Sequence, residues 1–513
     1  MDLENQGSNL VLRVGMVGDV LEDMLVGFRS KEKDVQVVGV WMTDEEGVEE
    51  KGEEKAVRQV AEKHGIGFRL WTDEKYFIDD RDIPFDSPRK YPDVFTSYRK
   101  SVEPLRDAPR RVLPTPKSLP TLPNFIPPQK EPFLIPGKYD GLQSALLKPL
   151  EARPLLPKIA PFPKGVKSAS PFEGGSKAGQ KRIQHLIASG AMTNYKDTRN
   201  GLLGLDFSTK LSAWLALGCI TARQVHFQLI DFEEGHNEEY RGTPGYGKGE
   251  NKGTAAVRFE LLWRDYMRLC TRKFGPRLFR VGGFRDDNSY PWKTPDGKGS
   301  GPEVKEAFER FLNGTTGTGL IDASQRELYH TGYTSNRARQ NVASYLAKHL
   351  GINWKLGAEW YESLLTDYDL SNNWGNWQYV AGVGNDPRGE ARVFNPVKQA
   401  VDYDPRGEYI KAWVEELRPL TEPQEIFQVW KVEPERRKKL DLESNIMVDK
   451  PLKRIDFRVG SKGGRGGGRY GGSSRNGNRG RGRGGPQNGY HYNGNGRYEK
   501  KGQEDKPRVN NGH

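Results

Sequence analysis

The stretch LLTDYDLSNNWGNWQYV, residues 364–380, combines residue types that seldom occur together in a plain surface loop. Asp367 and Asp369 stand two residues apart, two asparagines follow, and Trp374 and Trp377 come next. A buried aspartate costs several kcal/mol unless it is paired. The two carboxylates therefore need partners, either from the rest of the chain or from something that the stretch holds.

The charge of the chain is concentrated at its C-terminal end. The 513 residues, enough for two or three domains, carry 80 Lys+Arg against 68 Asp+Glu, a net charge of +12. Residues 459–513 hold twelve of the basic and three of the acidic residues, which leaves only +3 for everything before them. Residues 1–458 are therefore close to neutral, which excludes a positive potential over the whole surface that would attract nucleic acid. Any groove that binds nucleic acid has to be a local basic patch.

Cysteine usage and hydropathy restrict the compartment. The chain has two cysteines, Cys219 and Cys270, which cannot build a disulfide framework or a zinc cluster. A reducing compartment follows, and we expect the cytoplasm or the nucleus. No run of about 18 apolar residues occurs, so we expect neither a spanning helix nor a membrane partner. The opening MDLENQGSN resembles neither a signal nor a transit peptide.

The pattern of residues 1–112 predicts a partial α/β domain. Three β-rich runs, LVLRVG (10–15), VQVVGVWMT (35–43) and GIGFRLWT (65–72), alternate with helical stretches at 18–30 and 53–65. Alternating strands and helices favour a parallel sheet, here a thin one of three strands.

The rest of the chain divides by composition. Residues 113–179 are rich in proline and predict an extended interdomain connector. Residues 180–425 predict an all-helical domain, and residues 426–458 a C-terminal extension. Residues 459–513 are low-complexity Gly, Arg, Asn and Tyr, which cannot bury enough apolar area to fold, so we predict a disordered tail.

Three segments predicted to be helical carry polar residues at spacings that place them on one side of the helix. In RFELLWRDYMRLC (258–270), one side of the helix presents Glu260, Trp263, Arg264 and Met267. An aromatic platform beside a carboxylate suits a flat, hydrogen-bonding ligand. Taken alone, the segment equally fits an ordinary helix with a snorkelling arginine and a surface glutamate.

In YTSNRARQNVASYLAKHL (333–350), Ser335 is a plausible helix cap. One face carries Asn336, Arg339, Gln340 and Ala343, whereas Arg337 points elsewhere. Arginines near a helix start suit phosphate or carboxylate contact, although a plain basic first turn has the same pattern.

The Ser-Thr-Lys-Leu-Ser run at 208–212 stands where an apolar helix begins. Hydroxyls, free backbone N–H groups and the helix dipole together favour an anion, such as a pyrophosphate. A helix cap with extra hydroxyls is the alternative.

Together these segments resemble the photolyase/cryptochrome flavoproteins, and within them the cryptochrome-DASH branch. The resemblance is carried by residues 193–218, 258–269, 330–350, 367–388 and 392–410. The motifs WQYVAGVGNDPR and FNP-K-Q resemble DASH members more than enzymes that repair double-stranded DNA. The fold implied is an α/β, Rossmann-like photolyase domain, incomplete here, followed by an all-α FAD-binding domain and the disordered tail.

The resemblance implies that the opening stretch helps to hold FAD, folded into a U. The residues expected at its phosphates are Tyr195, Ser208, Thr209, Lys210, Leu211 and Ser212. Those expected around the isoalloxazine and the adenine are Arg264, Asn336, Arg339, Asp367 and Asp369. Asn373 matches the position that faces flavin N5, where photolyase-like members carry Asn and where it supports an electron-donating flavin.

The resemblance also makes Trp377, Trp354 and Trp292 an electron-transfer chain from the flavin to the surface. Without the family, three core tryptophans are the better interpretation, because distance along the sequence shows no such chain.

The activity implied is light-driven repair. Excited FADH⁻ passes an electron to a cyclobutane pyrimidine dimer, which splits and returns it. The resemblance gives Glu260 the role of hydrogen-bonding the dimer's carbonyls, Trp263 that of stacking against it, and Arg337 that of contacting a flanking phosphate.

Two departures bear on the substrate. Gln340 and Tyr379 stand where duplex-repair enzymes usually carry Met and Trp. A smaller, more polar pocket holds a flipped dimer less tightly, and flipping from a duplex costs a few kcal/mol. We therefore predict a preference for single strands.

The N-terminal part departs further from the family. The opening strand and FR-DLR segment of family members are absent, so the sequence looks like a truncated or short form and says nothing about organelle targeting. The segment YPDVFTSYRKSVE (91–103) resembles the part of DASH proteins that binds the antenna 5,10-methenyltetrahydrofolate, with Glu103 as candidate ligand. A helix with a surface glutamate is the alternative. A missing strand makes folate binding doubtful and exposes sheet edges.

The tail carries Arg465, Arg469, Arg479, Arg481 and Arg483 among glycines, with Tyr470, Tyr490, Tyr492 and Tyr498 between them. Such RGG segments, familiar in fungal DASH proteins, bind RNA or single strands through charge and stacking. A tail that only solubilises the protein is the alternative.

The sequence thus predicts a monomeric cryptochrome-DASH that repairs dimers in single-stranded DNA, or RNA, and binds RNA through its tail. A blue-light sensor with little repair activity and a non-enzymatic RNA-binding protein are the alternatives.

Overall fold

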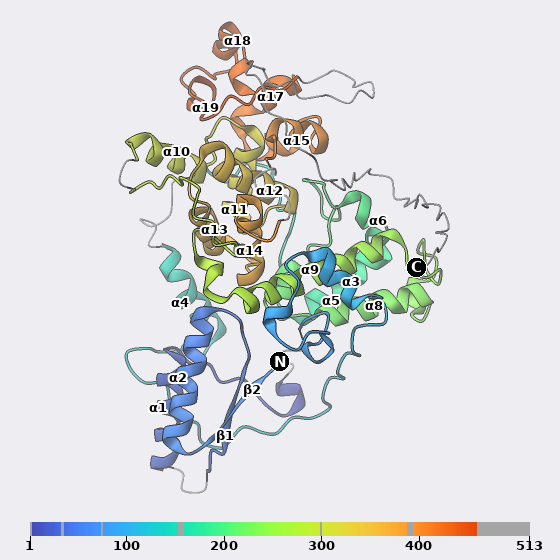
Figure 1. Ribbon diagram of the computed structural model, residues 1–513, viewed down its shortest axis with the longest axis vertical. Coiled ribbons are helices and arrows are strands. Elements are labelled where there is room, and N and C mark those ends of the chain that lie inside the picture. Colours follow the sequence, from blue (N-terminus) through green and yellow to red (C-terminus); the bar gives the residue numbers. More distant parts are fainter. Residues whose placement is uncertain are drawn as a thin grey trace, which may run out of the picture. The chain divides into compact units, whose positions relative to one another are not determined.

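Two short parallel strands form the sheet of the N-terminal part. The computed structural model describes residues 3–31, 35–72, 75–151, 159–297, 300–386 and 393–458. Strand β1 (Gly39–Thr43) runs parallel to β2 (Gly67–Trp71), with Gly39 opposite Gly67. Helices α1 (Val17–Lys31) and α2 (Val48–His64) lie against each other, and α2 contacts both strands (Figure 1). A small parallel α/β sheet is therefore confirmed.

The predicted strand at residues 10–15 is wrong. This segment is irregular, and its apolar side chains are exposed, Leu10 by 66%. The Val14 backbone is satisfied by the side chain of Gln129 instead of a neighbouring strand. Gln129 Nε2 donates to Val14 O at 3.0 Å, and Val14 N donates to Gln129 Oε1 at 2.9 Å. A β-rich run becomes a strand only where another strand is available to pair with it.

The described residues between 180 and 425 are mostly helical, as predicted. The helices after β2 are α3 Phe95–Val102, α4 Tyr139–Glu151, α5 Ser176–Ala188, α6 Ala191–Thr198, α7 Ser212–Ala216, α8 Ala222–Glu234, α9 Lys252–Phe274, α10 Pro302–Leu312, α11 Gly319–Thr331, α12 Asn336–Ser344, α13 Trp354–Leu364, α14 Leu370–Ala381, α15 Pro396–Tyr403, α16 Glu408–Trp413, α17 Pro423–Phe427, α18 Pro434–Lys439 and α19 Ile446–Asp449. The proline-rich segment 113–179 thus includes a helix, α4, and is not extended throughout.

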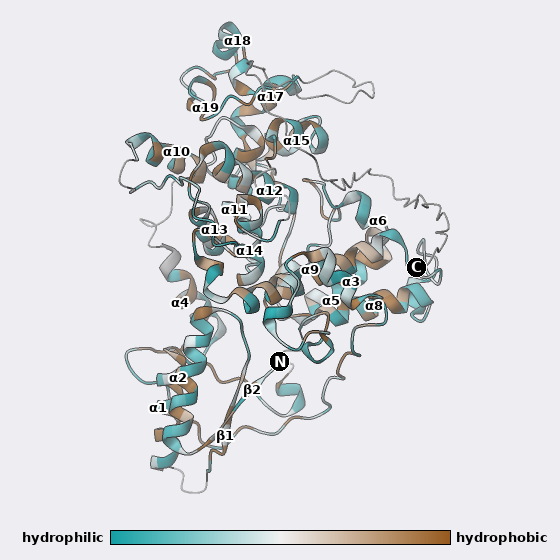
Figure 2. Cartoon of the chain, in the orientation of Figure 1, coloured by the Kyte–Doolittle hydropathy of each residue, from teal (hydrophilic) through white to brown (hydrophobic). Residues whose placement is uncertain are grey.

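The helical region buries two apolar clusters. The larger contains Tyr266, Trp354 and Trp377 together with residues from α3 to α14. The smaller surrounds Trp413 and includes Met447, so residues 426–458 fold back onto α11 and α16. Figure 2 shows the helices of this region with apolar and polar residues on different sides, the pattern of amphipathic helices around a core.

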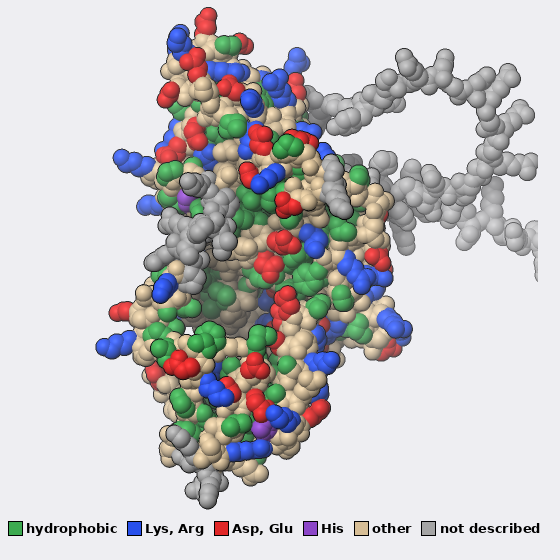
Figure 3. All heavy atoms as spheres, turned by 90° about the vertical axis from the view of Figure 1, so that its left-hand side faces the viewer, with side chains coloured by type: hydrophobic (Ala, Val, Ile, Leu, Met, Phe, Trp, Pro, Cys, Tyr) green, Lys and Arg blue, Asp and Glu red, His purple; other side chains and the backbone are tan. Residues whose placement is uncertain are grey.

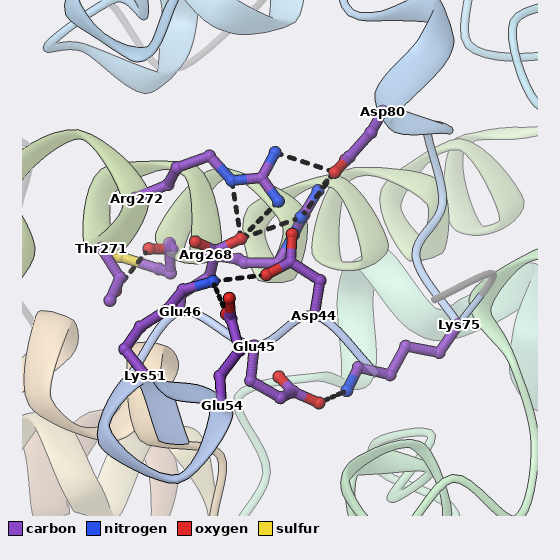
Figure 4. A network of polar contacts seen from close by, with 11 residues as sticks. Asp44, Glu45, Glu46, Lys51, Glu54, Lys75, Asp80, Arg268, Thr271 and Arg272 are labelled. Atoms are coloured by element: carbon purple, nitrogen blue, oxygen red, sulfur yellow. Dashed lines mark hydrogen bonds and ion pairs between the residues drawn. The ribbon is translucent and has the colours of Figure 1, made fainter. Parts of the chain in front are cut away.

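An ion-pair network attaches the N-terminal part to α9 (Figure 4). Glu46, just beyond β1, accepts from Arg272 Nε at 2.6 Å and lies 3.4 Å from Arg268 Nη1. Asp80 bonds to both arginines, with Arg272 Nη1 at 2.8 Å from its Oδ2. Burial of Arg268 is nearly complete, so its charge needs these partners. The network fixes the N-terminal part on the helix that also builds the cavity described below.

The molecular surface mixes both charge signs. On the face drawn in Figure 3, the surface is hollowed and hydrophobic side chains line the recess, with basic and acidic side chains interspersed around it. Within the described ranges, no helix is both long and apolar enough to cross a membrane. The predicted tail, residues 459–513, lies outside the described residues, as do all of its arginines and tyrosines.

Candidate functional site

One cavity gathers nearly all of the predicted site residues. It has a volume of about 540 Å³, within the range of small-molecule sites. The predicted cofactor residues that line it are Tyr195, Ser208, Thr209, Lys210, Leu211, Ser212, Arg264, Asn336, Arg339, Asp367, Asp369 and Asn373. The predicted substrate and electron-transfer residues that line it are Glu260, Trp263, Gln340, Tyr379 and Trp377. Arg337, Trp354, Trp292 and Glu103 are not among the lining residues.

Helical periodicity places the residues of α9 and α12. The residues predicted to share a face of α9, from Glu260 to Met267, all line the cavity, as do those of α12, from Asn336 to Ala343. Ser335 caps α12 by accepting from Ala338 N at 3.2 Å, as predicted. Arg337 lies outside the cavity lining and donates to Asn200 Oδ1 at 2.7 Å.

The two aspartates of the 364–380 stretch have arginine partners across the cavity. Arg339 Nη2 donates to both carboxylate oxygens of Asp367, at 3.1 and 2.9 Å. Arg264 Nε lies 3.5 Å from Asp369 Oδ2. Asp369 also caps α14 by accepting from Asn372 N at 3.0 Å. The two carboxylates and their arginine partners therefore form a charged part of the cavity wall, and they remain in contact with the space inside the cavity.

The 208–212 loop lines the cavity, while the head group of its lysine bonds elsewhere. Lys210 adopts a left-handed backbone conformation, with φ of 52°. Its ammonium donates to Ala169 O at 2.5 Å and to Gly204 O, neither of which lines the cavity. Burial first, and Arg182 second, lower the pKa of Lys210 to about 7. The lysine thus ties the loop to the connector, leaving the hydroxyls and backbone of 208–212 for an anion.

Glu260 stands on the cavity wall opposite an arginine that the sequence did not reveal. Arg199, just beyond α6, donates to Glu260 Oε1 through Nη1. The Glu260 side chain is 35% exposed, into the cavity. Desolvation raises the pKa of Glu260, while Arg199 and Tyr195 oppose that rise. Any ligand that displaces Arg199 therefore favours the protonated carboxyl, which can donate a hydrogen bond.

The three tryptophans of the predicted electron-transfer chain lie in different places. Trp377 is on α14, Trp354 is on α13, and Trp292 precedes α10. Trp377 lines the cavity, and its ring meets Tyr361 edge-on with centroids 5.2 Å apart. Trp354, three residues before Gly357, is fully buried, and its ring contacts Trp374 at 5.8 Å. Residue 293 is hydrogen-bonded to residues 351 and 353, which places neighbouring Trp292 beside the start of α13. Trp292 stacks on Tyr290 at 5.0 Å.

Two further predicted residues have defined partners. Asn373 is buried, and its Nδ2 donates to Ala358 O at 3.0 Å, which orients the amide. Glu103 ends α3, away from the cavity lining, with its side chain 41% exposed and 3.1 Å from Arg99 Nε. Folate binding at Glu103 stays a prediction.

Comparison with known proteins assigns the family. Residues 257–460 match the family model described as the FAD binding domain of DNA photolyase. A Neurospora crassa protein named as a cryptochrome DASH and as mitochondrial is 52% identical over 479 residues, which cover 90% of this chain and 64% of that protein. Cryptochrome DASH of Xenopus laevis is 38% identical over 421 residues, covering 82% of this chain and 70% of the relative. This chain belongs to the cryptochrome-DASH family.

Structural similarity agrees with the family assignment. A cryptochrome of Synechocystis sp. PCC6803 superimposes with a TM-score of 0.69 at 33% identity, covering 86% of this chain and 80% of that one. A class III photolyase of Agrobacterium tumefaciens shares the fold, with a TM-score of 0.64 at 23% identity. The chain spans about two thirds of the length of its Neurospora relative. The chain therefore has the photolyase/cryptochrome fold, and its parallel sheet is small.

The cavity of this cryptochrome-DASH chain fits FAD. Tyr361 Oη is buried on the cavity wall and has no hydrogen-bond partner among the described residues, so its O–H is left to bond to what fills the cavity. Burial raises the pKa of Tyr361, which keeps its O–H as a donor. Arg339 and Asp367 form an ion pair that lines the same cavity, and the 208–212 loop lines it with hydroxyls of the kind that bind phosphates.

Sequence reasoning missed two residues of the site. Phe95, the first residue of α3, stacks on Trp263 with ring centroids 3.7 Å apart and planes 10° apart, so one face of the indole is already covered. Arg199 pairs with Glu260. The sequence signalled neither residue. Phe95 lies in the segment that resembles the folate-binding part of DASH proteins, and Arg199 follows a short helix whose polar residues do not share one side.

Proposed function

We propose that this cryptochrome-DASH protein is a light-driven, FAD-dependent enzyme that repairs cyclobutane pyrimidine dimers in single-stranded DNA. One observation carries the proposal: Glu260 and Trp263 line the same cavity as the residues suited to FAD. A dimer seated against them is therefore beside the flavin. FAD, when bound and reduced, supplies on excitation the electron that splits the dimer.

The chain's own residues bind and polarise the dimer. Trp263 offers one face to a base, since Phe95 supports the other. Entry of the dimer displaces Arg199 from Glu260 and removes water from the carboxyl, which raises its pKa further. The protonated Glu260 then donates from its carboxyl oxygen to a carbonyl of the dimer and stabilises the charge that develops there.

The preference for single strands is part of the proposal. Gln340 and Tyr379 line the cavity and make that part of its wall polar. Such a wall offers little to offset the few kcal/mol that flipping from a duplex costs, whereas a single strand largely avoids this cost.

Replacing Glu260 tests the proposed function. Glu260→Ala should lower the repair yield on a single-stranded thymine-dimer oligonucleotide about 10- to 150-fold, because a hydrogen bond to a charged group contributes about 1.5–3 kcal/mol. The FAD content, read from the absorption spectrum, should stay unchanged. Glu260→Gln keeps an N–H donor and should retain more activity than the alanine variant. Release of FAD by Glu260→Ala would make Glu260 a cofactor residue instead.

A second candidate function is blue-light sensing, in which photoreduction of FAD changes partner binding. The placement of Trp377 at the cavity and Trp354 on the adjacent helix favours it. Intact photoreduction with no loss of dimers would select this function over repair.

The tryptophan chain gives an independent prediction. Trp377→Phe should nearly abolish reduction of bound FAD by light and an external thiol, because phenylalanine cannot be oxidised in its place. Trp413→Phe is the matched control, since Trp413 is equally buried but belongs to the smaller apolar cluster. Equal photoreduction rates in the two variants would remove Trp377 from the chain.

We also propose that residues 459–513 bind RNA or single-stranded DNA through arginine charge and tyrosine stacking. Removing these residues should weaken RNA binding and reduce its salt dependence without changing the FAD content. If the truncated protein loses all nucleic-acid binding, the alternative of a tail-driven RNA-binding protein is favoured.

A further inference from the structure

Trp374 is a second buried tryptophan at the middle of the predicted electron-transfer chain. It is 4% exposed and follows Asn373 on α14. Its ring meets that of Trp354 edge-on, with centroids 5.8 Å apart and planes at 82°. Electron transfer between aromatic rings in contact is fast, so a positive hole on Trp354 can be shared with Trp374.

The two indoles differ in where their N–H groups donate. Trp354 Nε1 donates to the backbone carbonyl of Val281 at 3.0 Å. Trp374 Nε1 donates to the carboxylate of Glu362, with 3.0 Å to Oε2. A backbone carbonyl cannot take up a proton at neutral pH, whereas a carboxylate can.

Glu362 also connects the buried indole to solvent. It is exposed and lies on α13, one turn beyond Ala358. Tyr368 faces the same carboxylate, and the pKa of its phenol is raised by burial first and by Glu362 second, so the phenol keeps its proton. A proton that reaches Glu362 from Trp374 can therefore leave to water.

We propose that Trp374 and Glu362 form a proton-coupled branch of the electron-transfer chain, an inference that rests on the proposed binding of FAD. FAD, when bound and excited in its oxidised state, would supply the oxidant for Trp377. Trp354 then returns an electron to Trp377, and Trp374 returns one to Trp354. Trp374 loses its Nε1 proton to Glu362 Oε2 as it is oxidised. One electron has then left the chain for that oxidant, and the chain carries a neutral Trp374 radical and a protonated Glu362. An external thiol later returns the electron and a proton to the indole.

Proton loss at this site delays charge recombination. A radical cation regains its electron readily, whereas a neutral tryptophanyl radical has to recover a proton as well. The branch thus converts a short-lived charge separation into a persistent one without requiring the hole to reach the surface at Trp292.

Transient absorption of the FAD-loaded protein tests the branch, because cationic and neutral tryptophanyl radicals absorb differently. Glu362→Gln keeps an oxygen that accepts the indole N–H but cannot take its proton. It should slow conversion of the cation to the neutral radical by about 100-fold, the low end for loss of a positioned base. The wild type should also show slower conversion in D₂O. Trp374→Phe should remove the neutral radical formed at this site and shorten the lifetime of the charge-separated state.

Trp360→Phe is the matched control, because Trp360 lies on the same helix as Trp354 and its Nε1 has no partner among the described residues. It should leave the kinetics unchanged. Wild-type kinetics in both Glu362→Gln and Trp374→Phe would overturn the branch while leaving the proposed function standing. Absence of any tryptophan radical in FAD-loaded wild type would contradict the electron-transfer chain itself.

Discussion

Asp367→Asn should weaken the binding of FAD. Asp367 is buried and accepts two hydrogen bonds from Arg339, whose side chain is 25% exposed, into the cavity. Removing one charge of a buried ion pair costs about 3–5 kcal/mol. Removing one charge of an exposed ion pair costs less than about 1 kcal/mol. This pair lies between those limits, so we expect about 2 kcal/mol, or a roughly 10- to 100-fold weaker flavin complex. Flavin titration of the apoprotein, followed by fluorescence quenching, measures the change.

Asp402→Asn is the matched control. Asp402 pairs with Lys398 one turn away on α15, and both side chains are exposed. Such a pair contributes about 0.3–0.5 kcal/mol, so this variant should bind FAD as the wild type does. Equal FAD affinity in the two variants would show that the Arg339–Asp367 pair does not hold the flavin.

Gly357→Ala should displace Trp377, one of the residues that line the cavity. A Cβ on Gly357 of α13 would lie 2.2 Å from the Trp377 ring, so the indole has to move toward the cavity. Overpacking of this kind costs about 1–3 kcal/mol, which exceeds the gain of about 0.5–1 kcal/mol from replacing a helical glycine. We expect a lower melting temperature, weaker FAD binding and slower FAD photoreduction.

Gly52→Ala is the matched control for that substitution. Gly52 lies within α2, and a Cβ there would meet nothing within 4 Å. The helix should gain about 0.5–1 kcal/mol, with the cavity unaffected. If Gly357→Ala were as stable as Gly52→Ala and photoreduced FAD normally, the close contact between α13 and Trp377 would be refuted.

The cavity was largely predictable because its residues follow helical periodicity. Glu260, Trp263, Arg264 and Met267 were assigned to one face of α9 from spacing alone, and the cavity lies on that face. The partners of Asp367 and Asp369 were not predictable from spacing. Arg339 and Arg264 are 28 and 105 residues away, and only the fold brings them together.

Other features depended on tertiary context. The run at 10–15 has strand composition but pairs with no strand in the described part of the chain, and its Val14 backbone bonds to the Gln129 side chain instead. Phe95 stacks on Trp263 across 168 residues of sequence. The hydrogen bond from Trp374 to Glu362 joins α14 to α13, and no spacing within either helix indicates it.

The most direct test measures dimer loss from a thymine-dimer oligonucleotide under blue light with a reductant, comparing the single strand with the duplex. The FAD content is read from the spectrum of the same sample. We predict that FAD-loaded protein clears dimers from the single strand much faster than from the duplex. Bound FAD with no dimer loss from either substrate would contradict the proposed repair function and leave light sensing as the function of this cavity.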